Sequence, residues 1–172
     1  MTTNTPVPVA DFKRAVGFMT SAVTVVTTTD DGRDYGMTAS SVTNLSADPP
    51  MMVACLRSDI PTARAVDQSG YYVVNVLDEN QTDLAYQFSR PAADKFTGAA
   101  THRTEAGVAV LDDALVSIVC RVVGRTPGGT HTMFSGEVLA VSTRGGKPLA
   151  YFRGGFGHFI TAQDEQLYCT LK

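Results

Sequence analysis

The 172-residue chain has little charge of either sign and no cluster of positive charge. Charged residues make up 18% of it, the net charge is −3, and the isoelectric point is near 5.5. Binding to nucleic acid requires clustered Lys and Arg side chains that neutralise phosphates. We therefore expect no nucleic-acid partner. The apolar fraction of 44% is ordinary for a globular protein, and this length predicts a single domain over residues 1–172.

Cysteine and histidine are scarce and widely spaced. The three cysteines form no CxxC pair, and the three histidines have no metal-ligand spacing. The sequence therefore predicts neither a disulfide framework nor a zinc site, and we expect no bound metal. The residues concerned are Cys55, Cys120 and Cys169, and His102, His131 and His158.

Long apolar runs are also missing. The longest, MMVACL, is far too short to cross a bilayer, and MTTNTPVPVADF lacks the basic and apolar parts of a signal peptide. We therefore expect a cytoplasmic protein with no membrane partner. The chain also lacks a P-loop, a G-x-G-x-x-G fingerprint and a G-x-S-x-G serine, so any nucleotide would have to bind to another architecture.

What is present is a series of short β-patterned segments with a few helical ones. The Asp-Gly in DDGRDYG indicates a hairpin, and Pro49 and Pro50 end the returning strand. Few βαβ units occur, so the fold class expected is mainly β with short helices, in a closed or nearly closed antiparallel barrel. Strands are predicted at 22–29, 35–46, 51–58, 71–77, 114–126 and 131–144, helices at 8–19, at 62–70 and after Asp78, and irregular structure at 89–112.

The segment YGMTASSVTNLS is unusual for a strand because its side chains are small and polar. Thr38, Ala39, Ser40 and Ser41 combine hydroxyls with an approachable backbone, which suits the polar edge of a flat heteroaromatic ring. An edge strand whose hydroxyls merely face water would have the same composition.

A phosphate site is suggested by a helix start. Ser58 and Thr62 lie where a helix is predicted to begin, and helix N-termini bind anions. Lys95 in DKFTG could supply a cation to the same phosphate. The alternative is an ordinary helix cap with a surface lysine.

Two further residues could border a ligand. His131 follows the PGGT loop and precedes a strand, which would place an imidazole at the mouth of a barrel. Phe156 lies between glycines that would let the backbone move around a ligand. An exposed loop histidine and a core phenylalanine are the alternatives.

Taken in order, these segments resemble the flavin reductase family, the small reductase components of two-component flavin-dependent monooxygenases. The resemblance covers about residues 12–160, which we expect to be the core of the domain. It includes FKRAVGFMTSAVTVVTT, GMTASSVTNLSADPP, YYVVNVL, DKFTG, HTMFSGEV and PLAYFRGGF. It implies an FMN-binding split β-barrel, antiparallel and Greek-key-like, that forms a homodimer.

The resemblance also implies roles for individual residues. The isoalloxazine and ribityl chain would lie along the segment from Thr38 to Val42, and the phosphate near Ser58, Thr62 and Lys95. The implied flavin-binding residues are Thr38, Ala39, Ser40, Ser41, Val42, Asn44, Leu45, Cys55, Ser58, Thr62, Lys95 and Phe96. The implied nicotinamide-binding residues are His131, Arg153, Gly155 and Phe156, although Thr130 stands where the family often has an aspartate.

The function implied is NAD(P)H:flavin oxidoreductase, with FMN or FAD as the flavin, NADH or NADPH as the donor, and a monooxygenase as the recipient of reduced flavin. The flavin would carry the chemistry, so no side chain is expected to be catalytic beyond positioning by His131. The alternative is a split-barrel protein that keeps its flavin and acts as an electron relay or without catalysis.

Overall fold

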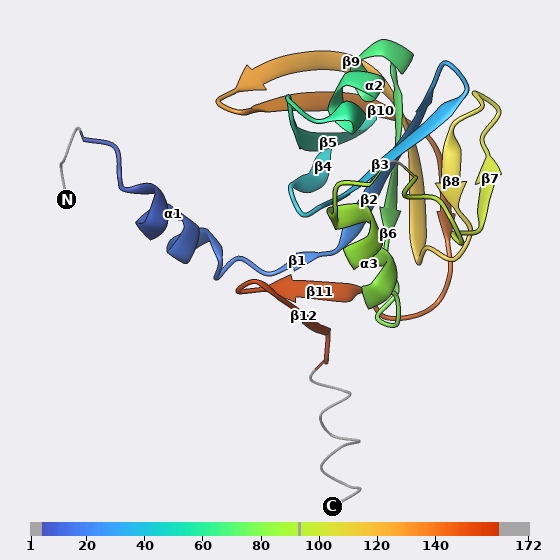
Figure 1. Ribbon diagram of the computed structural model, residues 1–172. Helices are drawn as coiled ribbons and strands as arrows, with labels where there is room; N and C mark the ends of the chain where they lie inside the picture. Colours follow the sequence, from blue (N-terminus) through green and yellow to red (C-terminus); the bar gives the residue numbers. More distant parts are fainter. Residues whose placement is uncertain (1–4, 93, 162–172) are drawn as a thin grey trace, which may run out of the picture.

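The structure is a computed structural model that describes residues 5–92 and 94–161, and it is built mainly from antiparallel strands around a curled sheet (Figure 1). The helices are α1 (Val9–Val16), α2 (Pro61–Ser69) and α3 (Thr82–Ser89). The strands are β1 (Ser21–Ala22), β2 (Thr24–Asp30), β3 (Arg33–Ala39), β4 (Val42–Ala47), β5 (Pro50–Arg57), β6 (Tyr71–Val76), β7 (Thr101–Arg103), β8 (Ala109–Leu111), β9 (Val116–Gly128), β10 (His131–Thr143), β11 (Leu149–Phe152) and β12 (Gly155–His158).

The order of strands in the main sheet explains why it closes. The seven-stranded sheet runs β3-β2-β6-β9-β10-β5-β4, so β3 and β4 form its two opposite edges. Only Ser40 and Ser41 separate these strands along the chain. The two edges must therefore meet at that point, and the sheet curls into a barrel that is split between β3 and β4. The mainly β, antiparallel split-barrel expectation is confirmed.

The barrel interior is filled by apolar side chains from strands that are far apart in the sequence. Fully buried Leu56, Val74, Cys120 and Phe134 belong to one cluster. Tyr72 lies among them and donates its hydroxyl hydrogen to the carbonyl oxygens of Met52 and Phe134. Burial of this apolar surface is the main term that stabilises the closed sheet.

The outer face of β2 and β6 is covered by other elements. A second cluster joins Leu77, Phe88 on α3 and Leu149 on β11. At the other end the β7–β8 hairpin covers Val73 and Val119. Asn75 is fully buried beneath this hairpin. Its amide N–H groups donate to the Val25 carbonyl and the Thr27 hydroxyl, and its amide oxygen accepts from the Leu111 N–H and the Ser117 hydroxyl.

Several expectations about local structure were wrong. Residues 35–46 are not one strand. The chain pairs with β2 as far as Ala39 and then, from Val42 on, pairs with β5. The segment 89–112 is not wholly irregular, since it contains β7 and β8. Ser117 on β9 is buried under the β7–β8 hairpin, and the Asn75 side chain accepts its hydrogen bond.

Helix α1 has an apolar stripe but no buried residue. It extends away from the barrel in Figure 1, and the exposed fractions of Val9 and Phe12 are 68% and 56%. Within the described residues, no helix is long and apolar enough to cross a membrane. Cys169 lies outside the described residues.

Candidate functional site

The split in the barrel leaves the segment from Thr38 to Ser41 accessible. Ala39 accepts a hydrogen bond from the Thr24 hydroxyl at 2.6 Å, and Ser41 accepts one from the Cys55 N–H at 2.9 Å, so both ends are fixed. The Ser40 and Ser41 side chains are exposed, and no hydrogen bond within the described residues involves their hydroxyls. These two hydroxyls are free to bind a ligand.

The other two side chains of this segment, Thr38 and Ala39, already make contacts within the protein. Thr38 donates its hydroxyl hydrogen to the Ala85 carbonyl at 2.6 Å, which ties β3 to α3. Ala39 is buried in the barrel core. A ligand beside these two residues would therefore contact mainly backbone.

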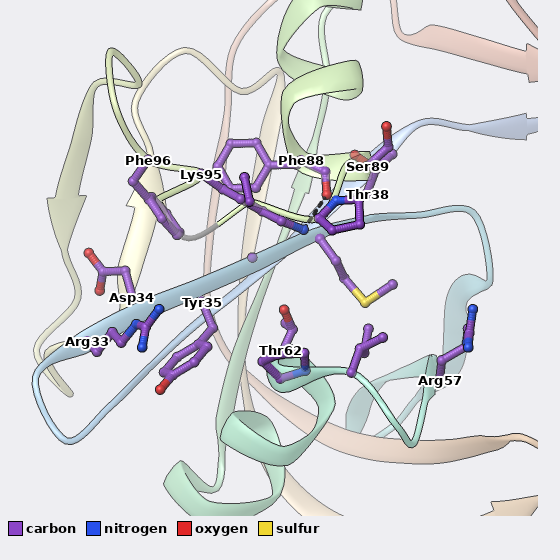
Figure 2. A pocket seen from close by; sticks show the side chains of 16 residues that line it. Arg33, Asp34, Tyr35, Thr38, Arg57, Thr62, Phe88, Ser89, Lys95 and Phe96 are labelled. Carbon is purple, nitrogen blue, oxygen red and sulfur yellow. Dashed lines mark hydrogen bonds between the residues drawn. The ribbon is translucent and has the colours of Figure 1, made fainter.

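Three hollows meet at this segment. We call the first the β3 groove; it has a volume of about 660 Å³ and lies between β3, the start of α2 and the end of α3 (Figure 2). The second, the α1 hollow, measures about 1110 Å³ and is bordered by α1, Ser40, Ser41, Cys55 and His131. The third, the aromatic hollow, measures about 340 Å³ and is lined by Tyr86, Tyr151 and Phe156 beside Thr38.

Lys95 and Thr62 face each other across the β3 groove (Figure 2). The Lys95 ammonium donates to the Phe88 carbonyl at 2.9 Å, near the C-terminus of α3. An ammonium has three N–H groups, so two remain for another acceptor. Partial burial lowers the pKa of Lys95, because desolvation disfavours its charge. A bound anion would relieve that cost.

The segment that carries Lys95 is held by Gln87, which the sequence did not single out. The Gln87 amide donates to the carbonyls of Lys95 and Thr97 at 2.8 and 3.0 Å. The Phe88 and Phe96 rings meet edge to face with centroids 5.0 Å apart, and Phe96 lines the groove. The lysine is therefore positioned by α3.

The predicted helix start is only partly correct. Pro61 and Thr62 are the first residues of α2, but its N-cap is Ile60 and makes no side-chain cap. The Ser58 hydroxyl instead pairs with the Thr132 hydroxyl at 2.9 Å. Thr62 lines the β3 groove and Ser58 does not. The structure thus brings Thr62 to Lys95 but leaves Ser58 beside the start of β10.

Cys55, His131 and Arg153 all border the α1 hollow. Burial raises the pKa of the Cys55 thiol, so it is not set up as a thiolate nucleophile. His131 begins β10 and its Nδ1 lies 2.9 Å from the Thr130 hydroxyl. The Arg153 guanidinium lies over the Phe18 ring, 4.8 Å from its centroid. The hollow therefore places an imidazole and a guanidinium within reach of the Ser40–Ser41 segment.

The remaining expected residues are more scattered. Phe156 packs against Tyr86, with centroids 5.0 Å apart, and lines the aromatic hollow. Gly155 is exposed at the start of β12 and lines none of the three hollows. On β4, Val42 packs on the core, whereas Asn44 and Leu45 are exposed next to a break in strand register.

Several lining residues could not be found from the sequence. Tyr86 and Ser89 lie on α3 and line the hollows only because α3 packs beside β3. No local pattern marks them. Within residues 5–92 and 94–161, no group of three or more His, Cys, Asp or Glu side chains is arranged to hold a metal ion.

The amino-acid sequence is similar to that of known proteins over most of its length. Residues 16–159 match the family described as the flavin reductase like domain. The chain is 42% identical over 155 residues to the reductase component of the 4-nitrophenol 4-monooxygenase/4-nitrocatechol 2-monooxygenase of Rhodococcus opacus, covering 90% of this chain and 83% of that protein. It is 34% identical over 145 residues to the FMN reductase (NADH) RutF 2 of Rhizobium rhizogenes, covering 83% and 84% respectively.

Similarity extends to solved structures. The NADH:FAD oxidoreductase SgcE6 of Streptomyces globisporus C-1027, in complex with NAD and FAD fragments, superposes with a TM-score of 0.85 at 27% identity, covering 90% of this chain and 94% of that one. The family match spans well over half of the chain and includes β1 to β12. The chain therefore belongs to the flavin reductase like domain family.

Proposed function

We propose that the chain is an NADH-dependent flavin reductase that supplies reduced flavin to a partner monooxygenase. The observation that carries the proposal is the convergence of the three hollows on the segment from Thr38 to Ser41. The names of its relatives, which include reductase components and NADH-dependent reductases, support this activity, the donor and the kind of partner.

The described residues fit a flavin nucleotide. The free hydroxyls of Ser40 and Ser41 can hydrogen-bond the polar edge of a ring, and the adjoining backbone lets the ring approach closely. The two unused N–H groups of Lys95, opposite Thr62, suit a phosphate. When bound, the flavin supplies the redox chemistry by accepting a hydride from the nicotinamide.

The side chains around the site position the reactants. His131 and Arg153 border the α1 hollow next to Ser40, where they can orient the nicotinamide nucleotide. Phe156 and Tyr151 line the aromatic hollow and exclude water from the neighbouring face of the segment. The thiol of Cys55, with its raised pKa, stays protonated and takes no part as a nucleophile.

The expected homodimer is part of the proposal. Its support is the unburied apolar stripe of α1 and further exposed apolar side chains on β10, Leu139 and Val141. Such exposed apolar surface is typical of contact sites between proteins. Light scattering after gel filtration would show twice the chain mass. The single domain over residues 1–172 and the cytoplasmic location also stay predictions.

Anaerobic spectroscopy tests the activity. The protein mixed with excess FMN or FAD and NADH under argon should bleach the flavin absorbance at a rate that rises with protein concentration. Gel filtration of the mixture then shows whether the flavin leaves the protein or stays bound. A reductase that supplies a partner enzyme should release its flavin, whereas an electron-relay protein would retain it. Absence of protein-dependent bleaching with both flavins would contradict the proposal.

A further inference from the structure

The β3 groove is longer than a phosphate site next to the split requires. It runs along β3 from Thr38 to Arg33, which is five residue-to-residue steps of strand or roughly 16 Å. Figure 2 shows Lys95 and Thr62 between two ends: Thr38 and Arg57 lie at one, and Tyr35, Asp34 and Arg33 lie at the other. A flavin mononucleotide with its ring at Thr38 and its phosphate at Lys95 would leave the second end empty.

The second end has a flat surface. The Arg33 guanidinium lies over the Tyr35 ring, 5.2 Å from its centroid. Tyr35 is half-buried and lines the groove together with Phe96. A stacked guanidinium and phenol ring form the kind of platform on which a purine base stacks.

The charge at this end also suits a ligand with a second phosphate. Asp34 is the carboxylate that lines the groove, and both of its oxygens accept hydrogen bonds from Arg103, at 2.5 and 2.8 Å. The Thr29 hydroxyl donates to it as well, at 2.7 Å. Asp94 does not line the groove; it accepts hydrogen bonds from the Phe96 N–H and the Thr97 hydroxyl, and its negative charge also interacts with the charge of Arg33. Among the residues that line the groove, three cationic side chains, Arg33, Arg57 and Lys95, stand against one carboxylate, Asp34, which Arg103 compensates.

We propose that this end of the β3 groove binds the adenosine monophosphate half of FAD, with the adenine against Tyr35 and Arg33, and that the protein therefore prefers FAD to FMN. The inference rests on the proposed function, because it places the flavin ring at Thr38 and the first phosphate at Lys95. It adds the flavin specificity and the residues that determine it.

Three flavins separate the contributions of the groove. Riboflavin has only the ring and ribityl chain, FMN adds one phosphate, and FAD adds the adenosine monophosphate half. Dissociation constants from quenching of flavin fluorescence, without NADH, should fall from riboflavin to FMN and again from FMN to FAD. Base stacking on an aromatic side chain contributes about 1–3 kcal/mol, so FAD should bind at least about fivefold more tightly than FMN.

Two variants test which residues give FAD its higher affinity than FMN. Arg33→Ala and Tyr35→Leu should each reduce the FAD advantage severalfold and leave the dissociation constants of FMN and riboflavin unchanged. Tyr35→Phe keeps the ring and should keep the advantage. Arg121→Ala is the matched control, since Arg121 pairs with Glu137 outside the groove. An unchanged riboflavin affinity also shows that each variant is folded.

The possible outcomes are distinct. If wild-type protein binds FMN as tightly as FAD, the inference is wrong even when NADH reduces both flavins. If FAD is preferred but Arg33→Ala combined with Tyr35→Leu keeps the preference, the adenine binds elsewhere and the inference is again overturned. If NADH reduces no flavin in the presence of the protein, it is the proposed function that fails.

Discussion

Gly36 on β3 makes room for the aromatic residues that position Lys95, and replacing it tests that arrangement. A Cβ atom at this position would lie 2.5 and 2.7 Å from Cε1 and Cδ1 of Phe88, and 3.3 Å from Cζ of Phe96. Phe88 is fully buried, so it cannot swing into solvent. The Gly36→Ala substitution must therefore displace α3 or force Phe88 from its rotamer.

The expected loss of stability follows from two opposing terms. Overpacking a core by one methyl group costs about 1–3 kcal/mol. Replacing glycine by alanine also removes freedom from the unfolded chain, which stabilises the protein by about 0.4–1 kcal/mol. Because contacts near 2.5 Å are severe, we expect a net loss of about 1–2 kcal/mol.

Gly124 on β9 provides the matched control. A Cβ atom there would meet only the Ser135 side chain, at 3.5 Å or more, which is ordinary contact. Gly124→Ala should therefore leave stability unchanged or raise it slightly. Urea unfolding followed by far-UV circular dichroism would measure both variants.

The same variant has a consequence for binding. The Phe88 carbonyl accepts the hydrogen bond from the Lys95 ammonium, so displacement of Phe88 moves the cation. Gly36→Ala should weaken FMN binding more than riboflavin binding. Equal unfolding free energies for Gly36→Ala and Gly124→Ala, with unchanged flavin affinities, would refute the reasoning.

Four further predictions concern individual side chains. Gln87→Ala removes two neutral hydrogen bonds to the Lys95 segment and should weaken FMN binding about three- to tenfold, with riboflavin affinity unchanged in the same titration. The phosphate needs the ammonium form of Lys95, and burial lowers the pKa of that group. The advantage of FMN over riboflavin should therefore decline as the pH rises, at a pH below the ordinary lysine pKa of about 10.4. A ratio of FMN to riboflavin affinity that stays constant up to that pH would contradict this. Asn75→Ala leaves several buried groups without partners and should lower the unfolding free energy by at least about 2 kcal/mol in urea. His131→Ala should raise the KM for NADH while flavin affinity stays within about twofold, and stopped-flow reduction at wild-type rate and NADH dependence would remove His131 from the site.

Most strands could be predicted because their residue patterns are local. The alternation in the segment of β9 and the Asp-Gly turn between β2 and β3 are visible in any short window of sequence. The Gly70 end of α2 is equally local, and Gly70 has the left-handed conformation expected of a helix C-cap.

The break between β3 and β4 could not be predicted in the same way. The alternation continues through Ser40 and Ser41, so the residues alone favour one strand from 35 to 46. The break exists because β3 pairs with β2 while β4 pairs with β5, at opposite edges of the sheet. Strand order is a property of the whole chain, and no short window contains it. Gln87 could not be predicted either. Its hydrogen-bond partners are eight and ten residues away in an irregular segment, and no periodic pattern links them to α3.

The position of the break explains the composition of the segment YGMTASSVTNLS. Where the chain leaves one edge of the sheet and joins the other, Ser40 and Ser41 lie outside both named strands and their hydroxyls have no partner among the described residues. Backbone and hydroxyl groups left unpaired at a surface must bind water or a ligand. Small side chains keep this crossing open to all three hollows, whereas a β-branched apolar residue would cover the exposed backbone. The closure of the barrel thus creates the polar opening that a flavin can occupy, and the small polar residues are explained by the fold and the function together.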